Sequence, residues 1–106
     1  MRELTIIDQA DQKFAAILAG RRCSFRVRYN GTSDRWTFDL SIDDVPVLYG
    51  RRIVTDVDLI EPFSFGIGAI FAAVVTEGAA PDRTGLPAGT VKLYHATEAE
   101  IAAALA

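Results

Sequence analysis

The fold is decided by residues 22–50, which read RCSFRVRYNGTSDRWTFDLSIDDVPVLYG. Apolar and polar residues alternate in two runs of this stretch, and the dipeptide Asn30-Gly31 lies between the runs. Because side chains on a strand point to opposite faces at every second residue, each run has one apolar and one polar face. Two such runs around an Asn-Gly dipeptide predict a β-hairpin.

The alternation also predicts which residues face each other across the hairpin. If Tyr29 pairs with Trp36, the apolar residues of both strands meet on one face. The pairs that follow are Val27 with Phe38, Phe25 with Leu40 and Arg26 with Asp39. We therefore expect a core that includes Phe25, Val27, Tyr29, Trp36, Phe38 and Leu40.

The composition is that of an ordinary folded domain. The chain has 106 residues, of which 50% are hydrophobic and 24% are charged, and this length suits one domain with one core. The net charge of −3 is a weak argument against nucleic acid as the main partner, because phosphate binding normally requires a strongly basic face. No secretory signal and no apolar run of membrane-spanning length is visible, so we expect a soluble protein made in the cytoplasm, with no membrane partner.

Further strands are predicted on both sides of the hairpin. They cover residues 4–7, 14–18, 45–49, 51–54, 66–75 and 90–95, with a bulge or sharp bend at Gly50. Residues 14–18 and 66–75 also fit a helix by pattern, and we favour strands for both. Residues 77–89 are rich in glycine and proline, so they predict a long irregular loop.

A short helix is expected at the C-terminal end. Thr97 and Glu100 have the spacing of a capping box, and Ile101 and Leu105 then share one helix face. The whole chain, residues 1–106, is thus predicted to be a single, mainly β domain. Its β body covers residues 1–95 and forms a small antiparallel barrel or sandwich, followed by a helix over residues 97–105.

Few residues offer chemistry. Cys23 is the only cysteine and lies on the apolar face of its strand, which predicts a buried side chain rather than a reactive thiol. His95 is the only histidine, and no serine or cysteine is near it in the sequence, so we expect a bystander. The chain is therefore predicted not to be an enzyme, with no cofactor and no catalytic residues.

Two acidic pairs and two glycines also favour structural roles. Asp43-Asp44 and the pair Asp56 and Asp58 stand where turns and strand edges place solvated carboxylates, so no metal site is expected. Gly66 and Gly68 lack the third glycine of a dinucleotide fingerprint. We expect these glycines to relieve crowding within a buried strand.

The arginines leave two readings open. Arg22, Arg26, Arg28 and Arg35 share the polar face of the hairpin, which fits a protein interface or a solvated face. The alternative is a small β-barrel that binds single-stranded nucleic acid by stacking bases on aromatic side chains. The aromatic residues fall on the opposite face, which favours the first reading. Contacts with partner proteins are predicted at Arg51, Arg52, Asp82 and Arg83.

The order of features over residues 14–94 resembles the small baseplate plug proteins of contractile-tailed bacteriophages. An apolar strand closed by Gly20 leads into an arginine-rich strand that ends in Tyr29-Asn30. A strand containing tryptophan (35–40), a proline-led strand ending in glycine (46–50), a piece with spaced Ile, Val and Leu (53–59), an acidic loop with prolines (77–89) and a closing strand (91–94) follow. The alanine-rich residues 69–73 and the tail after Tyr94 depart from the pattern.

This resemblance implies a structural, non-enzymatic protein of the virion tail. Such a protein sits near the axis of the baseplate in several symmetric copies. It bridges or plugs the region between the central hub and the surrounding wedge or tube proteins. The expected partners are therefore other baseplate proteins and further copies of the chain, and not nucleic acid.

Overall fold

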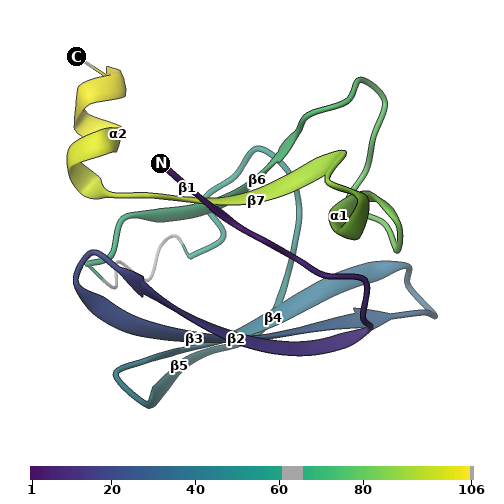
Figure 1. Cartoon of the computed structure of the whole chain (residues 1–106), viewed down its shortest axis with the longest axis horizontal. Coiled ribbons are helices and arrows are strands. Elements are labelled where there is room, and N and C mark those ends of the chain that lie inside the picture. The colour runs from purple at the N-terminus through teal and green to yellow at the C-terminus, as the bar shows by residue number, and fades with distance from the viewer. Residues whose placement is uncertain (61–65, 106) are drawn as a thin grey trace.

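The computed structural model of the protein describes residues 1–60 and 66–105. In this part of the chain the elements are β1 (Arg2–Leu4), β2 (Asp11–Leu18), β3 (Arg21–Asn30), β4 (Arg35–Ile42), β5 (Val45–Arg52), β6 (Ala69–Val74), α1 (Gly85–Ala88), β7 (Val91–Ala96) and α2 (Glu98–Leu105). They form two antiparallel sheets, one with the order β2-β3-β4-β5 and one with the order β1-β7-β6. The sheets face each other as a sandwich and do not close into a barrel (Figure 1). The prediction of a mainly β, antiparallel fold is confirmed.

The register of the β3–β4 hairpin is the one that the alternation predicts. Tyr29 pairs with Trp36, Val27 with Phe38, Phe25 with Leu40 and Arg26 with Asp39. The turn between the strands is fixed by Asn30, whose side-chain oxygen accepts hydrogen bonds from the amides of Thr32 (3.0 Å) and Ser33 (3.3 Å). Asparagine suits this position because its side chain can bond to the backbone two residues further on.

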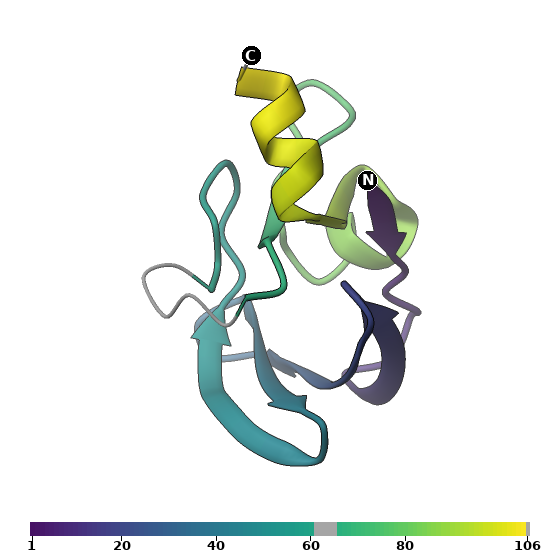
Figure 2. The same cartoon turned by 90° about the vertical axis from the view of Figure 1, so that its left-hand side faces the viewer.

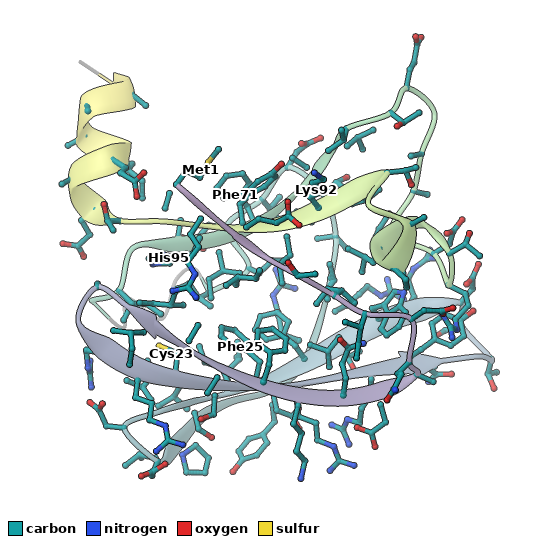
Figure 3. All side chains as sticks on the ribbon, viewed as in Figure 1. Met1, Cys23, Phe25, Phe71, Lys92 and His95 are labelled. Carbon is teal, nitrogen blue, oxygen red and sulfur yellow. The ribbon has the colours of Figure 1, made fainter. Side chains whose placement is uncertain are left out.

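The core fills the space between the sheets. Cys23 and Phe25 point up from the four-stranded sheet and His95 points down from the other (Figure 3). Trp36 and Phe38 are fully buried, and burial of such a side chain contributes about 1.5–3 kcal/mol. The other buried members from the hairpin are Cys23, Phe25, Val27, Leu40 and Ile42. Tyr29 is only half-buried and packs against this cluster, with its hydroxyl on the Asp34 carboxylate.

The N-terminal boundaries differ from the prediction because of one buried glutamine. The first strand is Arg2–Leu4 rather than residues 4–7. The side chain of Gln12 bonds the amide of Ile7 (2.9 Å) and its carbonyl (3.0 Å), so these backbone groups do not pair with a sheet. The second strand starts at Asp11 rather than at residue 14, since the polar residues before Phe14 join the ladder with β3.

The fifth strand carries the expected irregularity but ends sooner than expected. Gly50 has a φ of +61°, and the pairing with β4 shifts register on both sides of Leu40, which confirms a bulge. The strand ends at Arg52 rather than at residue 54. Residues beyond it are held by the Asp58 carboxylate, which accepts bonds from the amides of Ile60 (3.1 Å) and Ile70 (3.2 Å).

The apolar segment 66–75 is a strand, as predicted, but its glycines lie outside it. β6 begins at Ala69, and Gly66 and Gly68 precede it with φ angles of +79° and +99°. A side chain at Gly68 would also overlap the Ala96 carbonyl oxygen. The expectation that these glycines relieve crowding is therefore wrong for Gly66, which has open space around it, and confirmed for Gly68, although Gly68 lies just before the strand rather than within it. Both glycines also adopt a left-handed backbone.

The loop over residues 77–89 is more ordered than predicted. It contains α1, a single helical turn that ends at Gly89 with a φ of +81°. The Asp82 carboxylate accepts bonds from the amides of Gly85 (2.7 Å) and Thr84 (3.2 Å), so an acidic side chain organises the start of this turn.

The C-terminal helix begins with the predicted capping box. The Glu100 amide donates to Thr97 Oγ1 and the Thr97 amide donates to Glu100 Oε1, both at 3.1 Å. The helix rises from the end of β7 away from the four-stranded sheet (Figures 1 and 2). It touches the domain through half-buried Ile101 and through an ion pair between Glu100 and the amino group of Met1.

Candidate interface on the four-stranded sheet

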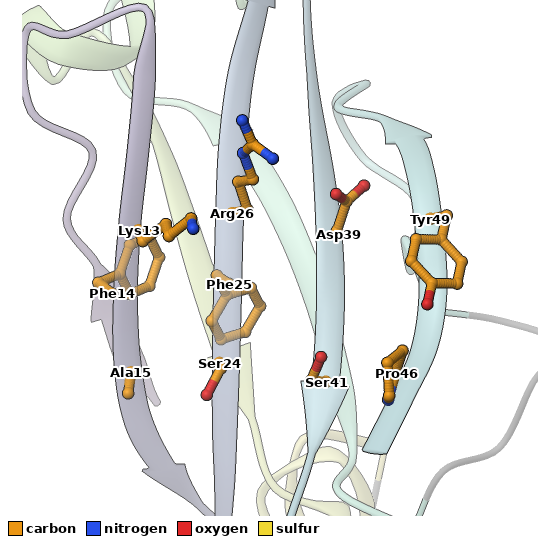
Figure 4. A pocket seen from close by; sticks show the side chains of 10 residues that line it. All are labelled: Lys13, Phe14, Ala15, Ser24, Phe25, Arg26, Asp39, Ser41, Pro46 and Tyr49. Carbon is orange, nitrogen blue, oxygen red and sulfur yellow. The ribbon is translucent and has the colours of Figure 1, made fainter. Parts of the chain in front are cut away.

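The outer face of β2–β5 carries a transverse row of small side chains. In the register of the four strands, Ala15 pairs with Ser24, Ser24 with Ser41, and Ser41 with Pro46. Short side chains in one row leave a depression between the larger side chains on either side. A trough of about 430 Å³ lies there, as Figure 4 shows.

Larger side chains form the walls of this trough. On one side stands a row of Lys13, Arg26, Asp39 and Tyr49, and the Tyr49 side chain is 71% exposed. Beyond the other side of the trough, the paired residues Ile17 and Arg22 come next in the register, and Ile17 is also exposed. The trough therefore offers a depression with both apolar and charged walls.

Positive charge is concentrated on this face. It carries six cations, Lys13, Arg22, Arg26, Arg28, Arg35 and Arg52, and two carboxylates, Asp11 and Asp39. The whole chain has a net charge of −3. The acidic residues thus lie mostly elsewhere, and the outer face of this sheet is a basic surface on an acidic protein.

Both carboxylates of the face are held by arginines. Arg26 donates to the two oxygens of Asp11 at 3.1 and 2.8 Å, and Arg28 binds the two oxygens of Asp39 at 3.1 and 2.9 Å. The hydrogen bond from Arg26 holds the pKa of Asp11 below its ordinary value. Within the described part of the chain, Lys13 and Arg22 make no ion pair and remain available to a partner.

Two of the predicted contact residues, Asp82 and Arg83, attach the α1 loop to the core. The Asp82 carbonyl accepts a bond of 2.7 Å from Trp36 Nε1, and the hydrogen bond from Gly85 lowers the pKa of the Asp82 carboxyl. Arg83 lies over the rings of Tyr29 and Trp36, 5.8 and 5.6 Å from their centres, and pairs with Asp8 at 2.7 Å. Their side chains are therefore already engaged within the chain.

The other two predicted contact residues, Arg51 and Arg52, have different surroundings. Arg51 Nε donates to the Leu59 carbonyl at 2.9 Å, so Arg51 holds the segment after β5. Arg52 is exposed and lies opposite Thr37 on the basic outer face. The structure thus places one of the four predicted residues on that face, whereas Arg83 packs against aromatic rings on the inner side.

Sequence reasoning missed the residues that shape the trough. Ser24 and Ser41 occupy outward positions and face each other in the predicted register, so the signal was present in the hairpin. Lys13 and Tyr49 join them only because β2 and β5 flank the hairpin in the same sheet. The order of the strands in the sheet belongs to the tertiary structure, and the alternation within one strand does not predict it.

Among the residues considered for chemistry, Cys23, His95 and Asp43 are buried or paired within the chain. Cys23 is fully buried, and burial raises the pKa of its thiol. His95 is buried with Nε2 against the Ile67 carbonyl. Asp43 pairs with Arg21 at 3.1 Å. In residues 1–60 and 66–105, no group of three or more His, Cys, Asp or Glu side chains is placed to hold a metal ion, and no helix there is long and apolar enough to cross a membrane.

One family of known proteins is similar to this chain. The family model described as "Cyanophage baseplate Pam3 plug gp18" matches residues 1–98. The match includes all the strands and α1, and it ends where α2 begins. No curated protein matches the chain.

Proposed function

Because the chain belongs to the family of the cyanophage baseplate plug, we propose that it is a structural subunit of a phage or prophage contractile-tail baseplate. The family match over residues 1–98 is the observation that carries this proposal. In this role the protein plugs or bridges the region between the central hub and the surrounding baseplate proteins. It acts there by contact and catalyses no reaction.

The fold supports an assembly role through a sheet edge. In the described part of the chain, β5 is an edge strand of the four-stranded sheet, and it exposes Val45 and Tyr49. Unpaired strand edges favour association with other chains, and closed symmetric assembly covers them. We therefore propose that several copies occupy one baseplate in the virion tail after synthesis in the host cytoplasm.

The basic face also gives a reason to consider single-stranded nucleic acid as the alternative partner. Six cations on one sheet face are a feature of proteins that track a phosphate backbone. Against this, two of the arginines are held by carboxylates of the same face, and Trp36, Phe38 and Phe25 are buried away from it. The baseplate role has the stronger support.

Quantitative mass spectrometry of purified tail particles tests the proposal. We expect a few copies per tail, in a fixed ratio to the hub protein, because a symmetric baseplate fixes the number of its subunits. The tube protein serves as the internal standard, and particles from a strain that lacks the gene serve as the control. Absence of the protein from intact particles would contradict the proposal and bring the nucleic-acid alternative forward.

A further inference from the structure

We propose that the trough on the outer face of β2–β5 receives an acidic segment of a different baseplate protein, with one large apolar side chain seated in the trough. This proposal rests on the baseplate role, because the partner is another protein of the same baseplate. What is new is the face of contact and the chemistry of the partner. Three properties of the face support it: its shape, its unpaired groups and its charge.

The shape favours a single large side chain. The floor of small residues gives way to the ring of Tyr49 on one strand and to the stem of Lys13 on another, which leans toward β3 in Figure 4. Ala15 and Pro46 supply apolar surface at the two ends of the row. Well-packed pockets that hold a central apolar or aromatic anchor carry most of the binding energy in protein interfaces.

Unpaired polar groups surround that depression. The hydroxyls of Ser24 and Ser41 have no hydrogen-bond partner among residues 1–60 and 66–105, although both residues are half-buried. Lys13 and Arg22 likewise lack an ion pair in this part of the chain. A partner that brings carboxylates would satisfy both kinds of group by charge-assisted hydrogen bonds.

The charge of the face favours this partner over two other possible occupants, a second copy of the chain and nucleic acid. Two copies that met face to face through β2–β5 would bring two basic surfaces together, which is unfavourable. Nucleic acid would meet Asp11 and Asp39 inside the basic area and, among the described residues, one exposed aromatic ring, that of Tyr49. A segment of another protein, with carboxylates around an apolar residue, matches both the cations and the trough.

The first test changes the trough in a gene-deleted phage or prophage that is complemented with variants. Ser41→Trp fills the trough, and Ala73→Trp adds the same bulk to the outer face of β6 as a matched control. We expect Ser41→Trp to lower the number of copies per tail by about tenfold or more, as for the loss of a central interface contact, and Ala73→Trp to leave it within about twofold. Circular dichroism of the purified variants checks that both remain folded.

The charge is tested separately with two double variants of equal net charge. Lys13→Gln with Arg22→Gln removes two unpaired cations from the basic face. Arg2→Gln with Lys92→Gln removes two cations from the other sheet. We expect only the first pair to reduce incorporation into tails, and equal incorporation of the two pairs would overturn the charge component of the proposal.

A photocrosslinker identifies the occupant. Benzoylphenylalanine in place of Tyr49 should form a crosslink in assembled particles to a peptide of another baseplate protein that contains Asp or Glu, whereas the same group in place of Ala73 should not reach that peptide. Crosslinks to a second copy of the chain or to nucleic acid would overturn the proposal. Normal incorporation of Ser41→Trp would also overturn it while leaving the baseplate role intact. If the unaltered chain is itself absent from tails, the baseplate role fails and the trough proposal falls with it.

Discussion

Trp36 connects several parts of the molecule. Its ring is fully buried and packs against Tyr29, with 5.3 Å between ring centres. Its Nε1 donates to the Asp82 carbonyl in the α1 loop, and Arg83 covers its face. A single indole thus joins the four-stranded sheet to a loop 46 positions away in the sequence.

Replacement of Trp36 separates its packing from its hydrogen bond. Trp36→Ala should lower the free energy of unfolding by about 3–5 kcal/mol, the cost of truncating a buried aromatic side chain. Trp36→Phe keeps most of the ring but leaves the Asp82 carbonyl without its donor, for which we expect a loss of about 1–3 kcal/mol. Denaturant melts measure both. A loss below about 1 kcal/mol for Trp36→Ala would contradict its place in the core.

At the scale of the elements, the two sheets depend on glycines with unusual backbone conformations. Gly50 lies in β5 with a φ of +61° and has open space where a side chain would be. Gly68 lies just before β6 with a φ of +99°, and a side chain there would overlap the Ala96 carbonyl at the end of β7. Both positions have a positive φ, but only Gly50 has space for an added side chain.

This difference predicts unequal effects of the same substitution. Gly50→Ala should cost about 1–2 kcal/mol, because only the left-handed backbone is strained. Gly68→Ala should add to this strain about 1–3 kcal/mol for overpacking, since rigid backbone atoms must move. Thermal melts of the two variants provide the comparison. Equal destabilisation would show that the contact between Gly68 and Ala96 relaxes without cost.

At the scale of the whole molecule, charge is separated from the aromatic core. Basic residues occupy the outer face of one sheet, while Phe25, Trp36 and Phe38 lie between the sheets. A single-stranded nucleic-acid binder needs both features on one surface, because bases stack on aromatic rings while cations follow the phosphates. Among the described residues, this face offers the cations with one exposed aromatic ring, that of Tyr49, rather than with a row of rings for stacking.

Nucleic-acid binding should therefore be weak. For a labelled oligothymidylate at physiological salt we expect a dissociation constant above about 100 μM, at or beyond the weak end of nonspecific binding. Fluorescence anisotropy measures it, with the Lys13→Gln and Arg22→Gln variant as the control for residual charge attraction. Micromolar affinity that falls steeply with added salt would instead support the nucleic-acid alternative.

The sequence by itself determined the hairpin, its register and the capped helix. Each depends on contacts within a short span of chain: alternation and Asn30 fix the pairing of Tyr29 with Trp36, and the Thr97 and Glu100 spacing fixes the start of α2. Order along the chain also carried the resemblance to the baseplate plug family, which the match over residues 1–98 shows.

Only the tertiary structure decided how these pieces meet. The Gln12 side chain binds the backbone of Ile7, so the first strand ends before Ile7. Arg83 packs over Trp36 instead of facing a partner. The trough exists because β2 and β5 flank the hairpin, so that small side chains from four strands align in one row. Such alignments join residues distant in the chain, and alternation within a strand specifies which face a side chain takes but not which strand lies beside it.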